Sequence, residues 1–238
     1  MSKRAVILAG GKGTRLRPYT AVLPKPLMPL GDYSILEIII RQLAGFGFTH
    51  ITMAVNHQAD IIQALYGDGY KWKVKIDYSL ENQPLSTMGP LKLIPDLPDD
   101  FLVMNGDILT DLNYGDFFNT HVAEKQIFSI SSHKREHKVD YGVLITDEKN
   151  SLTGFEEKPV YSFCVSMGIY MVNRKILDFI PDNKPFGFDH LMLKLISERQ
   201  KVAVRDHDGY WFDIGRPDDY MKVLDEFDAL KNKLLPNG

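Results

Sequence analysis

The sequence predicts an α/β domain with a mostly parallel sheet and helices on both faces. Short apolar runs alternate with amphipathic helical patterns through the first half of the chain, which is the order that builds parallel sheets. The 238 residues, 44% of them hydrophobic, can bury one sizeable core. We therefore expect a single domain over residues 1–238.

The first half of the chain repeats strand and helix. Residues 5–9 form an apolar run typical of a buried strand, and residues 34–48 show helical spacing that ends near Gly45 and Gly47. After them the patterns predict a strand at 50–55, a helix at 58–67, and strands at 72–79 and 101–107.

The second half changes character, because strand patterns follow one another with turn residues between them. These strands are expected at 126–132, 141–147, 151–159 and 163–172, some of them antiparallel. Two helical stretches (175–180 and 189–199), a strand at 201–206 and a charged helix ending near residue 233 close the chain. We expect one domain with two lobes and a cleft between them.

Composition excludes several classes of protein. The net charge of -3 shows no basic excess, so nucleic acid is not an expected partner. A single cysteine cannot form an internal disulfide, and no zinc-ligand spacing is present, which favours a reducing cytoplasm. The apolar run at the N-terminus is too short for a signal peptide, and no segment approaches the roughly 20 apolar residues of a membrane helix.

A glycine-rich loop follows the first strand, in the stretch LAGGKGTRLRPYT from Leu8 to Thr20. In an open parallel sheet the loop after the first strand commonly meets phosphate, and glycine lets backbone N–H groups approach an anion. The stretch is neither the dinucleotide fingerprint nor a P-loop, so a surface turn remains an alternative. Lys25, held between Pro24 and Pro26 by a stiff backbone, favours the phosphate interpretation.

These motifs resemble those of the sugar-phosphate nucleotidyltransferases, or nucleotide-sugar pyrophosphorylases. The resemblance rests on GGKGTRLRPYT and LPKPLMPL and continues through YSLENQPLSTMGPL, VMNGDIL, YGVL, GFEEKP, MGIYM and WFDIGRPDDY. It implies a Rossmann-like fold with a sugar-binding lobe of added strands, a nucleotide part at about 1–125 and a sugar-phosphate part at about 126–238. The implied reaction transfers a nucleotidyl group from a nucleoside triphosphate to a sugar 1-phosphate and releases pyrophosphate.

By the same resemblance, Arg15 grips the triphosphate and Lys25 lies at the reacting α-phosphate. Asp107 and Asp213 match the family's metal-binding aspartates, and Asp107 also joins Arg15 and Lys25 as a catalytic residue. Mg²⁺ is the cofactor implied, because it favours carboxylate, phosphate and water oxygens. The alternatives are a turn or capping role for Asp107, before the next helix, and a helix cap for Asp213. Asp111 is expected to be structural.

The resemblance also assigns the two substrates. The nucleotide is expected at Leu8, Ala9, Gly10, Gly11, Gly13, Thr14, Gln83 and Gly89, and the sugar phosphate at Gly142, Glu157, Lys158 and Ser166.

The base and the sugar are hypotheses drawn from two segments. PLSTMGPL is similar to the PLGTAGPL of mannose 1-phosphate guanylyltransferases, which favours GTP over dTTP, UTP and CTP. Ser86 and Met88 replace smaller residues of that pattern and could narrow the base pocket. Ser166 stands where many relatives have asparagine, which favours a heptose, a deoxy sugar or mannose.

Other features receive structural interpretations. The basic stretch 131–138 is expected to be a solvated loop, Cys164 to pack in the core, and the last helix to be half-solvated. Longer relatives carry a C-terminal β-helix domain, which is not expected here because the chain stops near the end of the catalytic domain. A catalytically silent regulatory homologue is the alternative from another class. A homo-oligomer is compatible with the sequence.

Overall fold

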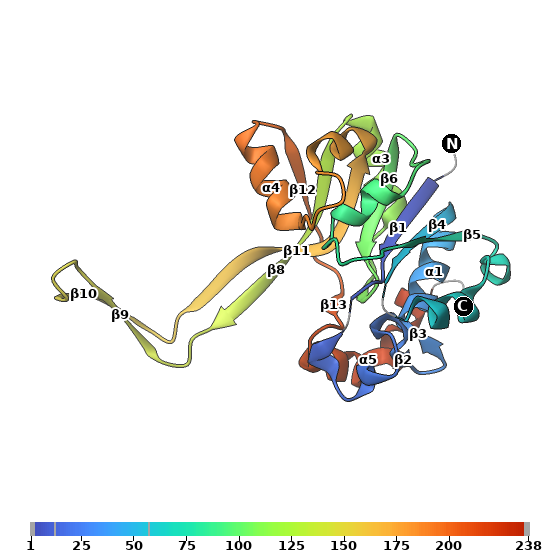
Figure 1. Ribbon diagram of the computed structural model, residues 1–238. Helices are drawn as coiled ribbons and strands as arrows, with labels where there is room; N and C mark the ends of the chain where they lie inside the picture. The colour runs from blue at the N-terminus through green and yellow to red at the C-terminus, as the bar shows by residue number, and fades with distance from the viewer. Residues whose placement is uncertain (1–2, 12, 57, 236–238) are drawn as a thin grey trace.

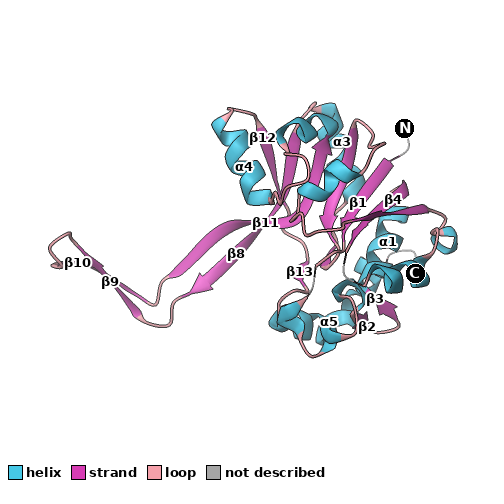
Figure 2. Ribbon diagram, in the orientation of Figure 1, coloured by secondary structure: helices cyan, strands magenta, loops and turns pink. Residues whose placement is uncertain are grey.

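A computed structural model describes residues 3–11, 13–56 and 58–235 and confirms the predicted α/β class. A central sheet with the strand order β12-β8-β11-β6-β1-β4-β5 carries helices on both faces (Figures 1 and 2). Its strands are β1 (Lys3–Leu8), β4 (Phe48–Val55), β5 (Lys75–Leu80), β6 (Asp100–Asn105), β8 (Phe128–Lys138), β11 (Val160–Asn173) and β12 (Val202–Asp206).

The N-terminal half forms the parallel part of the sheet. Strand β1 pairs in parallel with β4 and β6, and β4 pairs in parallel with β5. The crossover helix α1 (Ile35–Gly45) begins where the Ser34 hydroxyl accepts a 3.1 Å hydrogen bond from the Glu37 N–H, and its isoleucine-rich face is fully buried. Helix α2 (Ala59–Tyr66) follows β4. The predicted strands and helices of this half are confirmed.

The C-terminal half supplies the antiparallel part. Strand β11 pairs antiparallel with both β6 and β8, and β12 pairs in parallel with β8. Helices α3 (Tyr114–Ala123), α4 (Phe188–Ser197) and α5 (Pro217–Leu234) complete the fold. Two buried clusters form its core. Three short two-stranded sheets remain, β2 (Pro29–Leu30) with β3 (Tyr33–Ser34), β7 (Ile108–Thr110) with β13 (Trp211–Asp213), and β9 (Gly142–Thr146) with β10 (Leu152–Glu157).

Three local expectations need correction. The stretch 131–138 is not a loop, because it continues β8 and pairs with β11. Cys164 is exposed on β11 rather than packed in the core. The expected helix at 175–180 is a 3₁₀-helix, Arg174–Phe179. Helix α3 was not predicted, because Gly115 interrupts its helical pattern.

A long two-stranded arm leaves the sheet and extends away from the rest of the molecule (Figure 1). Its stem consists of the outer halves of β8 and β11, paired from Ser132–Ser166 to Lys138–Val160, and its tip is the hairpin β9–β10. We call residues 133–165 the arm. These added strands project outward and do not enclose the cleft that was expected between two lobes.

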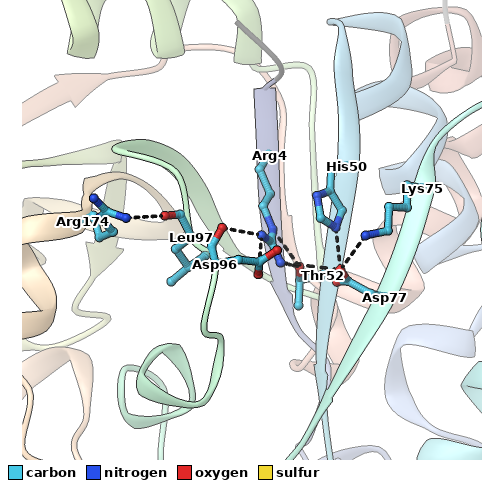
Figure 3. Close-up of polar contacts among 8 residues, drawn as sticks. All are labelled: Arg4, His50, Thr52, Lys75, Asp77, Asp96, Leu97 and Arg174. Carbon is cyan, nitrogen blue, oxygen red and sulfur yellow. Dashed lines mark hydrogen bonds and ion pairs between the residues drawn. The ribbon is translucent and has the colours of Figure 1, made fainter.

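Charged side chains link the parallel strands at their N-terminal ends (Figure 3). The buried Arg4 guanidinium donates hydrogen bonds of 3.0 and 2.7 Å to the Thr52 hydroxyl and one of 2.9 Å to the Asp96 carboxylate, and it lies 3.6 Å from the carboxylate of Asp77. His50 lies 2.6 Å from the same carboxylate. These contacts link β1, β4 and β5 at their N-terminal ends and leave the carboxyl ends free for ligands. No helix in the described residues is long and apolar enough to cross a membrane.

Candidate nucleotide site

A pocket of about 430 Å³ opens at the carboxyl ends of the parallel strands. This is the edge where open α/β sheets bind ligands, because the loops after successive strands meet there. The glycine loop after β1 and the segment after β5 form its walls. The lining residues are Leu8, Gly10, Gly11, Asn56, Glu81, Pro84, Ser86, Thr87, Pro90, Asn105 and Asp107.

The glycine loop is shaped by close approaches of its backbone. A Cβ atom at Gly10 would lie 3.2 Å from both the Asn56 Cβ and a carboxylate oxygen of Glu81, so the backbone passes close to the residues that follow β4 and β5. Gly13 has φ +60°, which glycine adopts at low cost, and its carbonyl accepts a 2.6 Å hydrogen bond from the Thr20 hydroxyl. The loop therefore folds back and places Thr14 and Arg15 on a short 3₁₀-helix with Arg15 exposed.

Lys25 and Asp107 form an ion pair beside this pocket. Lys25 begins a 3₁₀-helix, Lys25–Leu27, and its side chain is only 10% exposed, while that of Asp107 is 18% exposed. Asp107 follows β6, one residue beyond the turn glycine Gly106. The Lys25 ammonium is held by Asp107 and largely shielded from water. In that position it can attract a second anion besides the Asp107 carboxylate.

Pairing of β13 with β7 brings Asp213 to the same place. Asp213 is opposite Ile108, and the Ile214 N–H donates a 3.0 Å hydrogen bond to the Asp107 carbonyl. A Cβ atom at Gly215 would lie 2.7 Å from the Asp213 carboxylate and 2.9 Å from the Arg15 guanidinium, and it would also contact the Lys25 ammonium. Two cations and two carboxylates thus converge around Gly215.

The two carboxylates fit a divalent ion that keeps other ligands. One oxygen of Asp107 faces Lys25, and one oxygen of Asp213 accepts a 2.9 Å hydrogen bond from the Gly215 N–H. Within the described residues the other oxygen of each carboxylate has no hydrogen-bond partner. Among the residues that the structure describes, no set of three or more His, Cys, Asp or Glu side chains gathers to hold a metal ion. Mg²⁺ commonly binds to proteins through one or two carboxylates plus phosphate and water.

Neither Asp107 nor Asp213 is the N-cap residue of a helix. Asp107 precedes strand β7 and not a helix, and α3 is capped by the Asn113 side chain. Asp213 does organise the turn before α5, through its bond to Gly215, but the N-cap residue of α5 is Arg216. The Asp111 carboxylate is structural, as expected, since it accepts 2.8 Å hydrogen bonds from His207 and from the Tyr210 N–H.

Four residues expected near the nucleotide base lie outside the pocket lining, and one of them, Ala9, is buried in the core. Gln83 is exposed, and its amide donates a 3.3 Å hydrogen bond to the Asn183 carbonyl. Gly89 is buried against Leu85 and the backbone of Lys184. Met88 is fully buried in the core, so it cannot narrow the pocket as the sequence suggested.

The expected sugar-phosphate residues are divided between two places. Ser166 lies at the base of the arm, where its hydroxyl donates a 3.2 Å hydrogen bond to the Tyr170 hydroxyl and Met167 is buried. Gly142, Glu157 and Lys158 lie exposed on the arm, near the junction of its stem and tip. The structure therefore does not bring these three residues to Lys25 and Asp107 of the same chain.

Several polar residues of the pocket were missed by the sequence analysis. Asn56, Glu81 and Asn105 follow or end the parallel strands β4, β5 and β6, and the rule that ligands bind beyond strand ends could have identified them. Burial raises the pKa of Glu81, an effect partly offset by the 3.1 Å hydrogen bond that its carboxylate accepts from the Leu85 N–H. Glu81 is thus a desolvated acceptor facing the pocket.

Comparison with known proteins identifies the family. Residues 4–229 match the family model described as Nucleotidyl transferase. The chain is 33% identical over 227 residues to a mannose-1-phosphate guanyltransferase of Candida albicans and 34% identical to that of Schizosaccharomyces pombe; each match covers 92% of this chain and 62% of the relative. The chain thus spans less than two thirds of those relatives' length.

Solved structures show the same fold. HddC from Yersinia pseudotuberculosis has a TM-score of 0.74 at 27% identity, with 94% of this chain and 99% of HddC covered. Its complex with GMP-PN has a TM-score of 0.71 at 28% identity, with the same coverage. A putative glucose-1-phosphate thymidylyltransferase from Bacillus anthracis shares the fold at 22% identity, with a TM-score of 0.73 and 94% of each chain covered. The chain belongs to the nucleotidyl transferase family and, within it, is similar to the sugar-phosphate enzymes of the mannose-1-phosphate guanylyltransferase type.

Proposed function

We propose that this protein transfers a guanylyl group from GTP to a sugar 1-phosphate, giving a nucleotide sugar and pyrophosphate. One observation carries the proposal: Arg15, Lys25, Asp107 and Asp213 converge around Gly215, beside a pocket whose wall is a glycine loop. The reaction brings together two strongly repelling anions, and cations fixed between them lower that repulsion.

The chemistry needs no general base from the protein. A phosphate oxygen of the sugar 1-phosphate, already ionised at neutral pH, attacks the α-phosphorus of GTP. The new P–O bond forms as the bond from the α-phosphorus to the bridging oxygen breaks, and the electron pair leaves with pyrophosphate. Lys25 holds the α-phosphate and Arg15 the departing phosphates, so positioning and charge stabilisation supply the rate.

Asp107 and Asp213 would hold Mg²⁺ through the carboxylate oxygens that have no partner among the described residues. The ion, when bound, neutralises charge on the phosphates. Lys25, which pairs with Asp107, would share that carboxylate with the ion, and its ammonium would then stay close to the phosphate that it must contact.

Glu81 supports guanine as the base. Guanine presents two adjacent donors, N1–H and the 2-amino group, to one carboxylate, whereas uracil and thymine present a single N–H between two carbonyl oxygens. A desolvated carboxylate therefore bonds guanine twice and repels the pyrimidine carbonyls. The complex of the Yersinia relative with GMP-PN agrees with this choice. UTP, dTTP and CTP remain the alternative donors.

The acceptor is proposed from the relatives named as mannose-1-phosphate guanyltransferases. Ser166 leaves more room than the asparagine of many relatives, so a heptose or a deoxy sugar 1-phosphate is retained beside mannose 1-phosphate. Lys158, Glu157 and Gly142 are proposed to bind this acceptor.

The test is pyrophosphate release from a panel of triphosphates and sugar 1-phosphates, with and without Mg²⁺. We expect turnover only with both substrates and Mg²⁺, with GTP favoured over UTP and dTTP by at least about tenfold in kcat/KM, or ~1.4 kcal/mol. Best turnover with dTTP, UTP or CTP would refute guanine while leaving the reaction class intact. No turnover across the panel would refute the enzyme and favour a silent homologue.

A further inference from the structure

Within the described part of the chain, the arm is anchored to the rest of the molecule at its base. There the Arg135 guanidinium lies 2.7 Å from the Asp219 carboxylate and 4.7 Å from the centre of the Trp211 ring, and the Cys164 thiol lies 3.5 Å from the Asp206 carboxylate. From residue 136 to residue 162, all in the described part of the chain, the hydrogen bonds and ion pairs of the arm join arm residues to one another. The direction of the arm is therefore fixed at its base, and its outer part makes no hydrogen bond or ion pair with the rest of the described chain.

This geometry separates Lys158 from the nucleotide pocket of its own chain. Gly168, at the base of β11, lies next to the pocket residue Asn105, because a Cβ atom there would be 2.6 Å from the Asn105 amide. The paired stem then runs six residues outward from Ser166 to Val160, roughly 20 Å at ~3.3 Å per residue. Lys158 lies beyond that point, farther than a lysine side chain can reach back.

The outer arm also exposes much apolar surface. Eight large apolar side chains between residues 141 and 163 are 38–79% exposed, with Tyr141, Leu144 and Leu152 the most exposed. At about 150–250 Å² per side chain, the range for aromatic residues, these exposed fractions leave at most roughly 700–1,100 Å² of apolar surface in water. Each partner in a standard protein–protein interface buries about 800 Å². A two-stranded hairpin with no other packing is marginally stable, so this surface needs a partner.

From these observations we infer that two copies of this chain exchange arms, and that each arm supplies Lys158, Glu157 and Gly142 to the nucleotide pocket of the other copy. The inference rests on the proposed function, because that function gives these residues to the acceptor. Each copy has an open nucleotide half and a remote acceptor half, and a two-fold exchange completes both sites at once. Tyr19 and Val22, which are exposed in the segment between Arg15 and Lys25, provide apolar surface against which the arm of the other copy can pack.

Mixed dimers test the exchange. A chain with Arg15→Ala and a chain with Lys158→Ala are co-expressed with different affinity tags, and dimers carrying both tags are isolated. If the arms are exchanged, one site has both substitutions and the other has neither, so the mixed dimer should show about half of wild-type kcat/KM. For the Lys158→Ala dimer alone, kcat/KM for the sugar phosphate should fall about ten- to a hundredfold.

The opposite arrangement predicts a different result. If each arm served its own chain, every site of the mixed dimer would carry one substitution and activity would stay at the level of the single variants, which overturns the inference. An active wild-type enzyme with the 27.1 kDa mass of one chain, measured by light scattering, overturns it too. As a control, a mixed dimer of Arg15→Ala and Asp213→Asn chains must not recover activity, because both substitutions lie in the nucleotide half of the site. Lys149→Ala, on the exposed β9–β10 turn, should have the activity of the wild type.

A crosslink gives a readout that does not depend on activity. In a Cys164→Ser background, chains with Lys158→Cys and chains with Arg15→Cys are mixed and treated with a short bis-maleimide. We expect a crosslinked pair of the two chains. If that pair forms while the wild type is inactive on every substrate, the proposed function fails and the exchange stands. If the wild type is active and no crosslinked pair forms, the exchange fails and the proposed function stands.

Discussion

Replacing Gly215 with alanine should damage catalysis while leaving the fold intact. The added methyl group would contact the Lys25 ammonium and lie 2.7 Å from the Asp213 carboxylate and 2.9 Å from the Arg15 guanidinium. All three are the ends of flexible side chains, so the protein can accept the methyl group by moving them. The backbone of Gly215 is not in the left-handed region, so alanine adds no strain there.

The expected magnitude follows from the number of charges displaced. Loss of one preorganised electrostatic contact typically lowers kcat by about 10²–10³, or ~2.7–4 kcal/mol. Gly215→Ala moves at least one cation away from the phosphates, so we expect a fall in kcat of about a hundredfold or more.

The assay is pyrophosphate release at saturating GTP, sugar 1-phosphate and Mg²⁺, with the Tm of each variant measured in parallel. Gly115→Ala is the matched control, because Gly115 lies in helix α3 and an alanine there is expected to preserve activity. A kcat within threefold of the wild type would refute the convergence of charges around Gly215. A large fall in Tm would instead assign Gly215 a structural role.

Three further predictions follow from single side chains. Glu81→Gln should reduce the preference for GTP over UTP by about tenfold in kcat/KM, since the neutral amide keeps only one acceptor, and an unchanged ratio would remove Glu81 from base selection. Ser86 has φ +65°, so Ser86→Gly should raise the free energy of unfolding by about 1 kcal/mol, and a lower Tm would contradict the strain. Burial acts to raise the pKa of Asp77, but hydrogen bonds from Thr52 and His50 and the nearby positive charges outweigh it and lower that pKa, so its stabilising effect is present above about pH 4 and is lost as pH falls further. Asp77→Asn should therefore lose less Tm than the wild type between pH 6 and pH 3, and equal losses would exclude this carboxylate as a source of acid sensitivity.

The parallel half of the fold could be predicted because local patterns decide it. The run 5–9 and the helical spacing of 34–48 specify which face is buried, and both elements appear where the sequence places them. The glycine loop and the rigid Pro24-Lys25-Pro26 segment likewise indicated an anion site without knowledge of the rest of the chain. Asn56 and Asn105 were within reach of the same rule and were overlooked.

The segment after β5 could not be assigned in detail, because its side-chain directions depend on one unusual backbone conformation. Ser86 occupies the left-handed region, which is uncommon for a residue with a side chain. After this turn Thr87 faces the pocket and its hydroxyl accepts a 2.8 Å hydrogen bond from the Phe188 N–H, while Met88 enters the core. The sequence shows a serine in place of a glycine but not which neighbours then face inward.

The arm was missed for a different reason. Strand patterns at 141–147 and 151–159 carry apolar residues whether the strands lie in a central sheet or in a free hairpin, so periodicity cannot report what covers them. The stretch 131–138 is rich in lysine, arginine and histidine, and its charge suggested a loop, although residues 132–138 pair with β11.

The position of Asp213 beside Asp107 could not be predicted from the sequence, because it depends on the register between two strands far apart in the chain. Strand β13 reaches β7 across roughly a hundred residues of chain, and a shift of one residue in that register would turn Asp213 to the other face and away from Lys25. The Ile214 N–H donates a hydrogen bond to the Asp107 carbonyl, and the Asp213 N–H donates one of 3.4 Å to the Asp219 carboxylate, which also anchors Arg135 of the arm. Helix α5 therefore connects the proposed metal ligand to the base of the arm, so the nucleotide half of the site and the direction of the arm depend on the same few contacts.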